Sequence, residues 1–345
     1  MPSSTFTHHI MLHSFSIALA AILSVFCIVG AGILFRRTGR LTLEAEQPLL
    51  RLTVDLLLPC LIFDRVLKTD AFSDLQNLWL PPLLGFGLTA VGILFGLCVA
   101  FLPTKQSGLE TWKQRRSFAG CVGIFNYGFV PIPLVIALFP DNGKMLGVLF
   151  VQNLGAEFSV WTIVLSILMG KIDRKSLQHV INGPSIAIVL SVSLNLLGNS
   201  RLVPVEFHEY IAPCFDFLLQ AIHLLGAAGI PLSIILIGTI FSDHFCRDEI
   251  MERLPITLKI AFWSILIRLV VMPIICVSLA VWLPCTLEIK QVLIVHGAMG
   301  SAIFPMVLAK HYGGDPKTAF DTILSNSLLS VLTLPIWVAV GLKLI

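Results

Sequence analysis

Charged residues are scarce in this chain of 345 residues: Asp, Glu, Lys and Arg make up 12% of it, against roughly 25% in soluble domains. Hydrophobic residues account for 56%, and the mean hydropathy is +0.91. Apolar stretches long enough to cross a hydrocarbon layer of ~30 Å recur throughout. The composition excludes an ordinary water-soluble domain and predicts a polytopic helical membrane protein. The net charge of +3 is too small to indicate a nucleic-acid partner.

Motifs for metal binding, disulfides and catalysis are also missing. The eight cysteines show no CxxC spacing, and several of them lie inside apolar runs, where they are typical of small buried hydrophobic residues. The chain contains no HExxH, no GxSxG and no GxxxxGK[ST]. We therefore expect no metal site, no cofactor and no enzymatic activity.

What the sequence does contain is a series of ten apolar segments that we predict to be membrane spans. Their predicted ranges are Ser14–Phe35, Leu49–Val66, Trp79–Phe101, Ser117–Phe139, Gly143–Met169, Pro184–Leu197, Phe215–Phe241, Pro255–Leu283, Leu287–Lys310 and Asp321–Leu344. The connections between them are short, and residues 170–183 join two halves, 14–169 and 184–344.

Basic residues predict the orientation of these spans. Of the 23 Lys and Arg residues, 15 fall in or beside the connections after spans one, three, five, seven and nine, and 6 in or beside the other connections and tails. Because Lys and Arg concentrate in cytoplasmic loops, the first set is predicted to be cytoplasmic. Both termini then lie on the outer, periplasmic side of a cytoplasmic membrane.

The two halves resemble each other around proline and asparagine. Pro133 precedes Asn153 by 20 residues, and Pro305 precedes Asn326 by 21. Since each half has an odd number of spans, two tandem copies must have opposite topology, as in inverted-repeat transporters. A chance alignment of Pro and Gly in a ten-helix chain is the alternative.

An interruption is predicted near the middle of the fourth span. Asn126, Tyr127 and Gly128 are followed by Pro131 and Pro133. Proline removes a backbone donor and disrupts the preceding turn, whereas glycine tolerates any φ. The start of the next half-helix carries partial positive charge and can hold an anion. The alternative is a proline-kinked helix in which Asn126 bonds locally.

The ninth span contains a matching stretch with Gly300, Ser301 and Pro305. Such interruptions are tolerated at membrane depth only where they line a polar cavity or are buried in protein. A pair in corresponding places of two halves indicates the central site of a secondary transporter. Small residues also favour plain helix packing, which is the alternative here.

Ionisable residues inside spans are further candidates, because their burial in a membrane is unfavourable. Glu157 and His296 are candidates for proton coupling, and Arg268 for charge balance with a substrate carboxylate or an acid. Arg51 and Asp55 stand four residues apart and are predicted to pair on one helix face.

Three stretches of the chain resemble the auxin efflux carrier family of membrane transporters, in its bacterial branch. They are RRTGRLTLEAEQPLLRLTVDLLLPCLIF from Arg36, NYGFVPIPL from Asn126 and PMVLAKHYGGDPKTAFDTILSNSLLSVLTLPIW from Pro305. The chain departs from the family pattern at Phe125 and Gly300, where proline is common, and at Ser301, which stands in place of an amide. It also lacks the long hydrophilic middle loop of the plant carriers.

The resemblance implies an all-α fold of ten helices in an inverted five-plus-five repeat, of the sodium/proton antiporter and bile-acid transporter type. Helices 1, 2, 6 and 7 would form a scaffold, and helices 3–5 and 8–10 a transport unit with two broken, crossing helices. The implied substrates are small organic anions, such as indole acetate or malate and malonate, with a substrate role for Asn126.

Three functions follow as hypotheses. The first is a secondary transporter of small carboxylates that works by alternating access. The second is a sodium- or proton-coupled carrier similar to bile-acid transporters. The third is a membrane sensor that binds an anion without moving it. The lipid bilayer is an expected partner, and a homodimer is left open.

Overall fold

The computed structural model describes residues 4–128, 130–140, 142–170, 181–199, 205–244 and 254–345. Every regular element of these residues is helical, apart from one isolated β-bridge. In the first half the helices are α1 (Ser4–Arg37), α2 (Leu43–Leu52), α3 (Leu58–Leu67), α4 (Gln76–Ala100), α5 (Thr104–Ser107), α6 (Trp112–Gly123), α7 (Pro131–Leu138), α8 (Gly143–Ser159) and α9 (Leu165–Met169). In the second half they are α10 (Gly183–Asn199), α11 (Val205–His244), α13 (Leu254–Ile265), α14 (Met272–Trp282), α15 (Leu287–Ala298), α16 (Phe304–His311) and α17 (Pro316–Leu344).

Three of the helical rods contain a π-helical segment, in which each turn takes up an extra residue. The segment η1 (Thr53–Leu57) joins α2 to α3, η3 (Val160–Val164) joins α8 to α9, and η5 (Leu266–Val271) joins α13 to α14. Each continuous rod coincides with one predicted span, and α8 to α9 has the predicted bounds Gly143–Met169.

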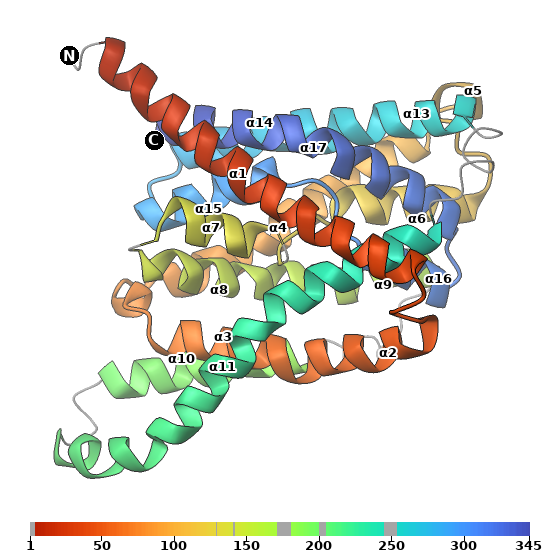
Figure 1. Ribbon diagram of the computed structural model, residues 1–345. Coiled ribbons are helices and arrows are strands. Elements are labelled where there is room, and N and C mark those ends of the chain that lie inside the picture. Colours follow the sequence, from red (N-terminus) through yellow and green to blue (C-terminus); the bar gives the residue numbers. More distant parts are fainter. Residues whose placement is uncertain (1–3, 129, 141, 171–180, 200–204, 245–253) are drawn as a thin grey trace.

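Five of the described helical rods are long and apolar enough to cross a membrane: Gln76–Ala100, Gly143–Met169, Asp216–Asp243, Ile256–Trp282 and Pro316–Leu344. The protein is thus an all-helical membrane protein. α17 begins at Pro316, ahead of the predicted Asp321, because Asp315 caps its first turn by accepting a hydrogen bond from the Thr318 amide at 3.0 Å. The first residues of α1 and the end of α17 lie at the same end of the molecule, at the left of Figure 1.

The helices form layers around a central group (Figure 1). α2, α3 and α10 lie at the bottom of this view, α13, α14 and α17 at the top, and α4, α6, α7, α8 and α15 between them. α1 and α11 run across the front and pack on each other. A Cβ atom on Gly32 of α1 would lie 3.0 Å from the Cα of Gly238 of α11, so small residues set this close approach.

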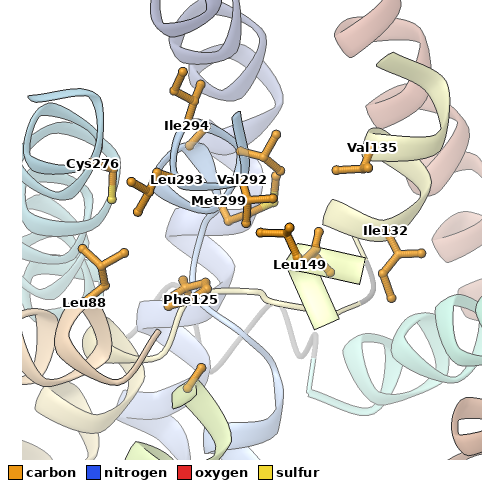
Figure 2. Packing of buried hydrophobic residues seen from close by; sticks show 14 of the residues in the cluster. Leu88, Phe125, Ile132, Val135, Leu149, Cys276, Val292, Leu293, Ile294 and Met299 are labelled. Atoms are coloured by element: carbon orange, nitrogen blue, oxygen red, sulfur yellow. The ribbon is translucent and has the colours of Figure 1, made fainter. Parts of the chain in front are cut away.

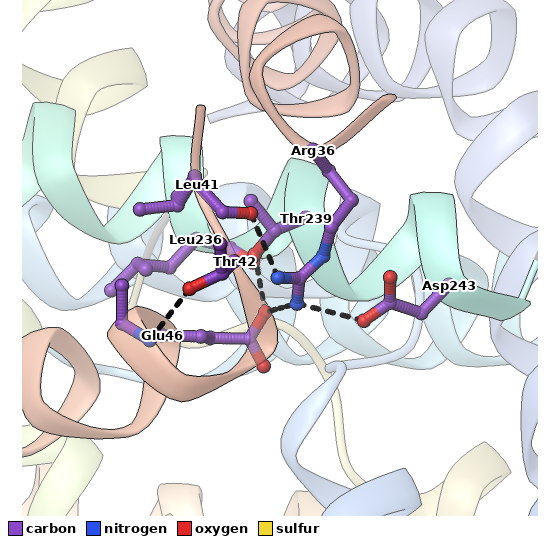
Figure 3. Close-up of polar contacts among 8 residues, drawn as sticks. Arg36, Leu41, Thr42, Glu46, Leu236, Thr239 and Asp243 are labelled. Carbon is purple, nitrogen blue, oxygen red and sulfur yellow. Dashed lines mark hydrogen bonds and ion pairs between the residues drawn. The ribbon is translucent and has the colours of Figure 1, made fainter. Parts of the chain in front are cut away.

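Ion pairs join the ends of α1, α2 and α11 that lie at the right of Figure 1, and Figure 3 shows them from close by. The Arg36 guanidinium pairs with Glu46 and, at 2.8 Å, with Asp243, and it also donates to the Leu41 carbonyl. The Thr239 hydroxyl donates to Glu46 at 2.7 Å. Arg36 and Glu46 come from the stretch that carries the first family resemblance, so this stretch builds a joint between three helices.

Candidate functional site

Two helical rods are interrupted, and the interruptions contact each other. α6 ends at Gly123 and α7 begins at Pro131; α15 ends at Ala298 and α16 begins at Phe304. We call the described residues between them the first break, 124–128 and 130, and the second break, 299–303. Their backbones form an antiparallel bridge: the Asn126 amide donates to the Gly300 carbonyl and the Ala302 amide to the Ile124 carbonyl, both at 2.9 Å. Each break thus satisfies part of the other's backbone, which a low-dielectric interior requires.

The second helix after each break donates an asparagine amide to it. Asn153 of α8 donates to the Tyr127 carbonyl at 2.8 Å, and Asn326 of α17 donates to the Ser301 hydroxyl at 2.8 Å. These are the two asparagines whose spacing from Pro133 and Pro305 indicated a repeat. The amide oxygens of both are buried and have no hydrogen-bond partner among the described residues.

Apolar side chains pack tightly on one side of the breaks. Phe125 and Met299 are almost completely buried, among Leu149 of α8, Val292 of α15 and Ile132 of α7 (Figure 2). This packing fixes the positions of both breaks and leaves their other sides free to line cavities.

A cavity of about 450 Å³ opens beside the first break. Asn126, Tyr127 and Gly128 line it, together with the start of α16 and residues from α3, α8, α10 and α11. The Asn126 side chain is half-buried and makes no hydrogen bond within the part of the chain that the structure describes. Its amide is therefore available to a molecule in the cavity.

Glu157 lies in the wall of this cavity and accepts three hydrogen bonds. The donors are the Tyr127 hydroxyl at 3.3 Å, the Trp161 indole at 3.1 Å and the Asn182 amide at 3.0 Å. Asn182 also caps α10 by accepting a hydrogen bond from the Ser185 amide at 2.9 Å. One carboxylate therefore joins the first break, η3 and the start of α10.

The two half-helix starts differ in the donors they present. α7 begins Pro131-Ile132-Pro133, so two of its first three residues lack an N–H, and the Ile132 amide already donates to Gly128 at 3.3 Å. At α16 the amides of Ile303 and Phe304 bond to no other described residue, and both residues line the cavity. The second break thus supplies the free amides, while the first supplies a helix end and the Asn126 side chain.

A second hollow, of about 60 Å³, lies on the other face of the breaks. Its walls come from α1, α11 and α17 as well as from both breaks. Asn126 and Ile303 line both spaces, and Ser301 lines only the smaller one. The breaks therefore form a partition between a large cavity and a small hollow.

Arg268 and His296 lie away from both cavities. The Arg268 side chain is 1% exposed, donates to the carbonyls of His296 and Met299 at 2.9 and 2.8 Å, and lies 5.3 Å from the centre of the Phe125 ring. His296 Nδ1 lies 2.9 Å from the Gln152 amide nitrogen. Arg268 thus binds the carbonyl end of α15, where the helix dipole favours a cation, and contacts no carboxylate in the described residues.

The predicted pairing of Arg51 with Asp55 is wrong. Both side chains are exposed, and no ion pair joins them within 4.0 Å. Asp55 lies in the π-helical segment Thr53–Leu57, and Arg51 lies just before it. Because both side chains are exposed, water solvates both charges and an ion pair between them would gain little free energy, so their spacing alone does not bring them together.

Sequence reasoning missed Trp161, Asn153 and Asn182 as site residues. Asn153 was visible only as a repeat marker, and Asn182 only as part of the connection 170–183. Trp161 follows Glu157 by four residues, and this helical spacing is the one signal that could have revealed a neighbour of the carboxylate.

Comparison with known proteins assigns the chain to a family. A family model described as "Membrane transport protein" matches residues 17–178 and 171–338. An uncharacterized transporter of Methanothermobacter thermautotrophicus is 23% identical over 317 residues, 92% of this chain and 96% of the relative. An uncharacterized transporter of Methanocaldococcus jannaschii is 24% identical over 329 residues, 93% of this chain and 98% of the relative. With both halves matched, this membrane protein belongs to the membrane transport protein family, that of the auxin efflux carriers.

Proposed function

We propose that this protein is a secondary transporter that moves small organic anions across the cytoplasmic membrane by alternating access. The observation that carries the proposal is the pair of hydrogen-bonded breaks that separates a large cavity from a small hollow. A non-helical backbone at membrane depth is maintained where it lines such a cavity.

The arrangement of the two cavities supports an inverted repeat of ten spans. The large cavity is walled chiefly by α3, α10 and α8, which belong to the second, sixth and fifth predicted spans. The small hollow is walled by α11, α1 and α17, from the seventh, first and tenth. In an inverted repeat of the two halves, 14–169 and 184–344, the second span corresponds to the seventh, the first to the sixth and the fifth to the tenth. Each helix that walls the large cavity therefore has its repeat counterpart in the wall of the small hollow, and the small hollow would be the closed counterpart of the large cavity. Helices 1, 2, 6 and 7 would then form the scaffold.

The proposed binding site lies at the breaks. The free amides of Ile303 and Phe304 and the positive end of the α16 dipole favour a carboxylate, and Asn126 orients it. Tyr127, Gly128, Pro131 and Pro133 shape the first side. Gly300, Ser301 and Pro305 shape the second.

The test is uptake of labelled mono- and dicarboxylates, including indole-3-acetate, malate and malonate, into proteoliposomes. We expect Asn126→Ala to reduce uptake at least about tenfold, since a hydrogen bond to a charged group contributes about 1.5–3 kcal/mol. The control is Asn142→Ala, which removes the N-cap of α8 outside both cavities and so shows how far a loss of stability alone lowers uptake.

Two results would contradict the proposal. Wild-type uptake in folded Asn126→Ala protein would remove the site assignment. Tight binding of an acid with no exchange across the bilayer would indicate the anion sensor instead.

A further inference from the structure

The described residues that line the large cavity include one carboxylate and no cationic side chain. Of the residues that line it, Glu157 is the one Asp or Glu, none is Lys, Arg or His, and Tyr127 is the other titratable group. The three donors to Glu157 are neutral side chains. The ionised carboxylate is thus hydrogen-bonded, but its charge is not neutralised within the cavity.

Helices packed on α8 supply no counter-charge. α4, α7 and α10 contain no Asp, Glu, Lys, Arg or His. On α3, Asp64 is paired with Lys68 at 2.5 Å and His223 at 2.9 Å, and Arg65 lies 3.9 Å from Asp64. On α15, Glu288 and Lys290 lie in the first turn, and His296 faces Gln152 rather than the cavity.

The repeat shows that the fold does not require an acid at this position. Glu157 stands four residues after Asn153, and the residue four after Asn326 is Ser330. Ser330 lines the small hollow as Glu157 lines the large cavity. The carboxylate is therefore present in the large cavity but not at the corresponding position of the small hollow, which indicates a role other than support of the fold.

An organic anion that enters the large cavity places a second negative charge beside Glu157. Two like charges in an apolar, partly desolvated space favour binding of a proton by one of them. We propose that Glu157 binds the proton that accompanies the anion, so that the protein is a proton–anion symporter; this rests on the transport function proposed above. A proton from water on the side to which the cavity opens binds a carboxylate oxygen and returns to water on the other side.

Protonation also changes the contacts of Glu157. Its bond to Asn182 joins α8, in the proposed transport unit, to the start of α10 in the proposed scaffold. A neutral carboxyl accepts a hydrogen bond less strongly than a carboxylate. Proton binding thus weakens a contact between the two parts at the step when they must separate.

The test uses proteoliposomes of phosphatidylethanolamine and phosphatidylglycerol and whichever labelled acid of the panel above is taken up, with proton movement followed by an internal pH dye. For the wild type we expect one proton to enter with each anion. At pH values where Glu157 is ionised in the empty protein, each increase of one pH unit should raise the acid concentration that gives half-maximal uptake about tenfold. This is the dependence expected when binding of one anion requires binding of one proton.

Glu157→Gln keeps the shape of the side chain and should make substrate binding independent of pH while ending proton entry. Glu157→Asp, which keeps a carboxyl, should retain coupling. The matched control is Glu44→Gln on the exposed first turn of α2, which should behave as the wild type.

Two results would overturn this inference and leave the proposed transport function in place. The first is uptake of the acid by the wild type without proton entry, and the second is unchanged proton entry in Glu157→Gln. The absence of uptake of every acid in the panel would overturn both.

Discussion

Arg268 shows how a buried charge can serve the breaks without touching a substrate. Its guanidinium binds two carbonyls at the end of α15 and lies over Phe125 of the first break. A planar fork with several donors suits this geometry better than the single ammonium of lysine. Arg268 is therefore a positioning residue, and its place in the sequence alone did not distinguish this role from charge balance with a substrate.

Arg268→Lys should lower the free energy of unfolding by about 1.5–3 kcal/mol, because at least one hydrogen bond from a charged donor is lost. Uptake should fall as well, since the second break loses part of its support. Melting of the detergent-solubilised protein and uptake by proteoliposomes measure the two effects. Arg51→Lys, an exposed arginine with no ion pair among the described residues, is the control. Equal stability and activity of the two variants would contradict this role.

At the scale of elements, the sequence predicted what depends on local chemistry. Pro131, Pro133 and Pro305 lie in the first turns of α7 and α16, directly after the interruptions that they predict. What it could not predict depends on partners distant along the chain or on solvent exposure. Asn182, at the start of α10, donates to Glu157 of α8, whereas Arg51 and Asp55 are both exposed and form no ion pair within 4.0 Å.

Glycines determine how closely α4 approaches α8. A Cβ atom on Gly85 would lie 2.1 Å from the Gln152 carbonyl oxygen, whereas one on Gly87, two residues along the same helix, meets nothing within 4 Å. Gln152 precedes Asn153, which holds the first break, so this contact also positions the site.

Gly85→Ala should therefore lower the free energy of unfolding by about 1–3 kcal/mol, as overpacking of a close contact does. Gly87→Ala makes the same chemical change in open space and should leave stability unchanged or slightly raised, because alanine favours the helix. Thermal melting of both variants in detergent checks the pair. A smaller loss in Gly85→Ala than in Gly87→Ala would show that this helix contact is not as close as described.

At the scale of the whole molecule, alternating access predicts that the two cavities change in opposite directions. Leu58 lines the large cavity and Ser327 the small hollow, and both side chains are half-buried. The large cavity extends to Ile181 and Asn182, beside the connection predicted to be cytoplasmic. It should therefore open to the cytoplasm in the state described here.

Two single-cysteine variants, Leu58→Cys and Ser327→Cys, are made in a protein that lacks the eight native cysteines. The rate at which each cysteine reacts with a membrane-impermeant thiol reagent measures how accessible its cavity is from water. Without substrate, Leu58→Cys should react from the cytoplasmic side and Ser327→Cys only slowly. A transported acid should slow the first reaction and speed the second from the outer side, because the population moves toward the opposite opening. Lys113→Cys, on the exposed first turn of α6 outside both cavities, should react from the cytoplasmic side at a rate that the acid does not change. Parallel changes at Leu58 and Ser327 would mean that the two spaces open together, and alternating access would then be wrong for this protein.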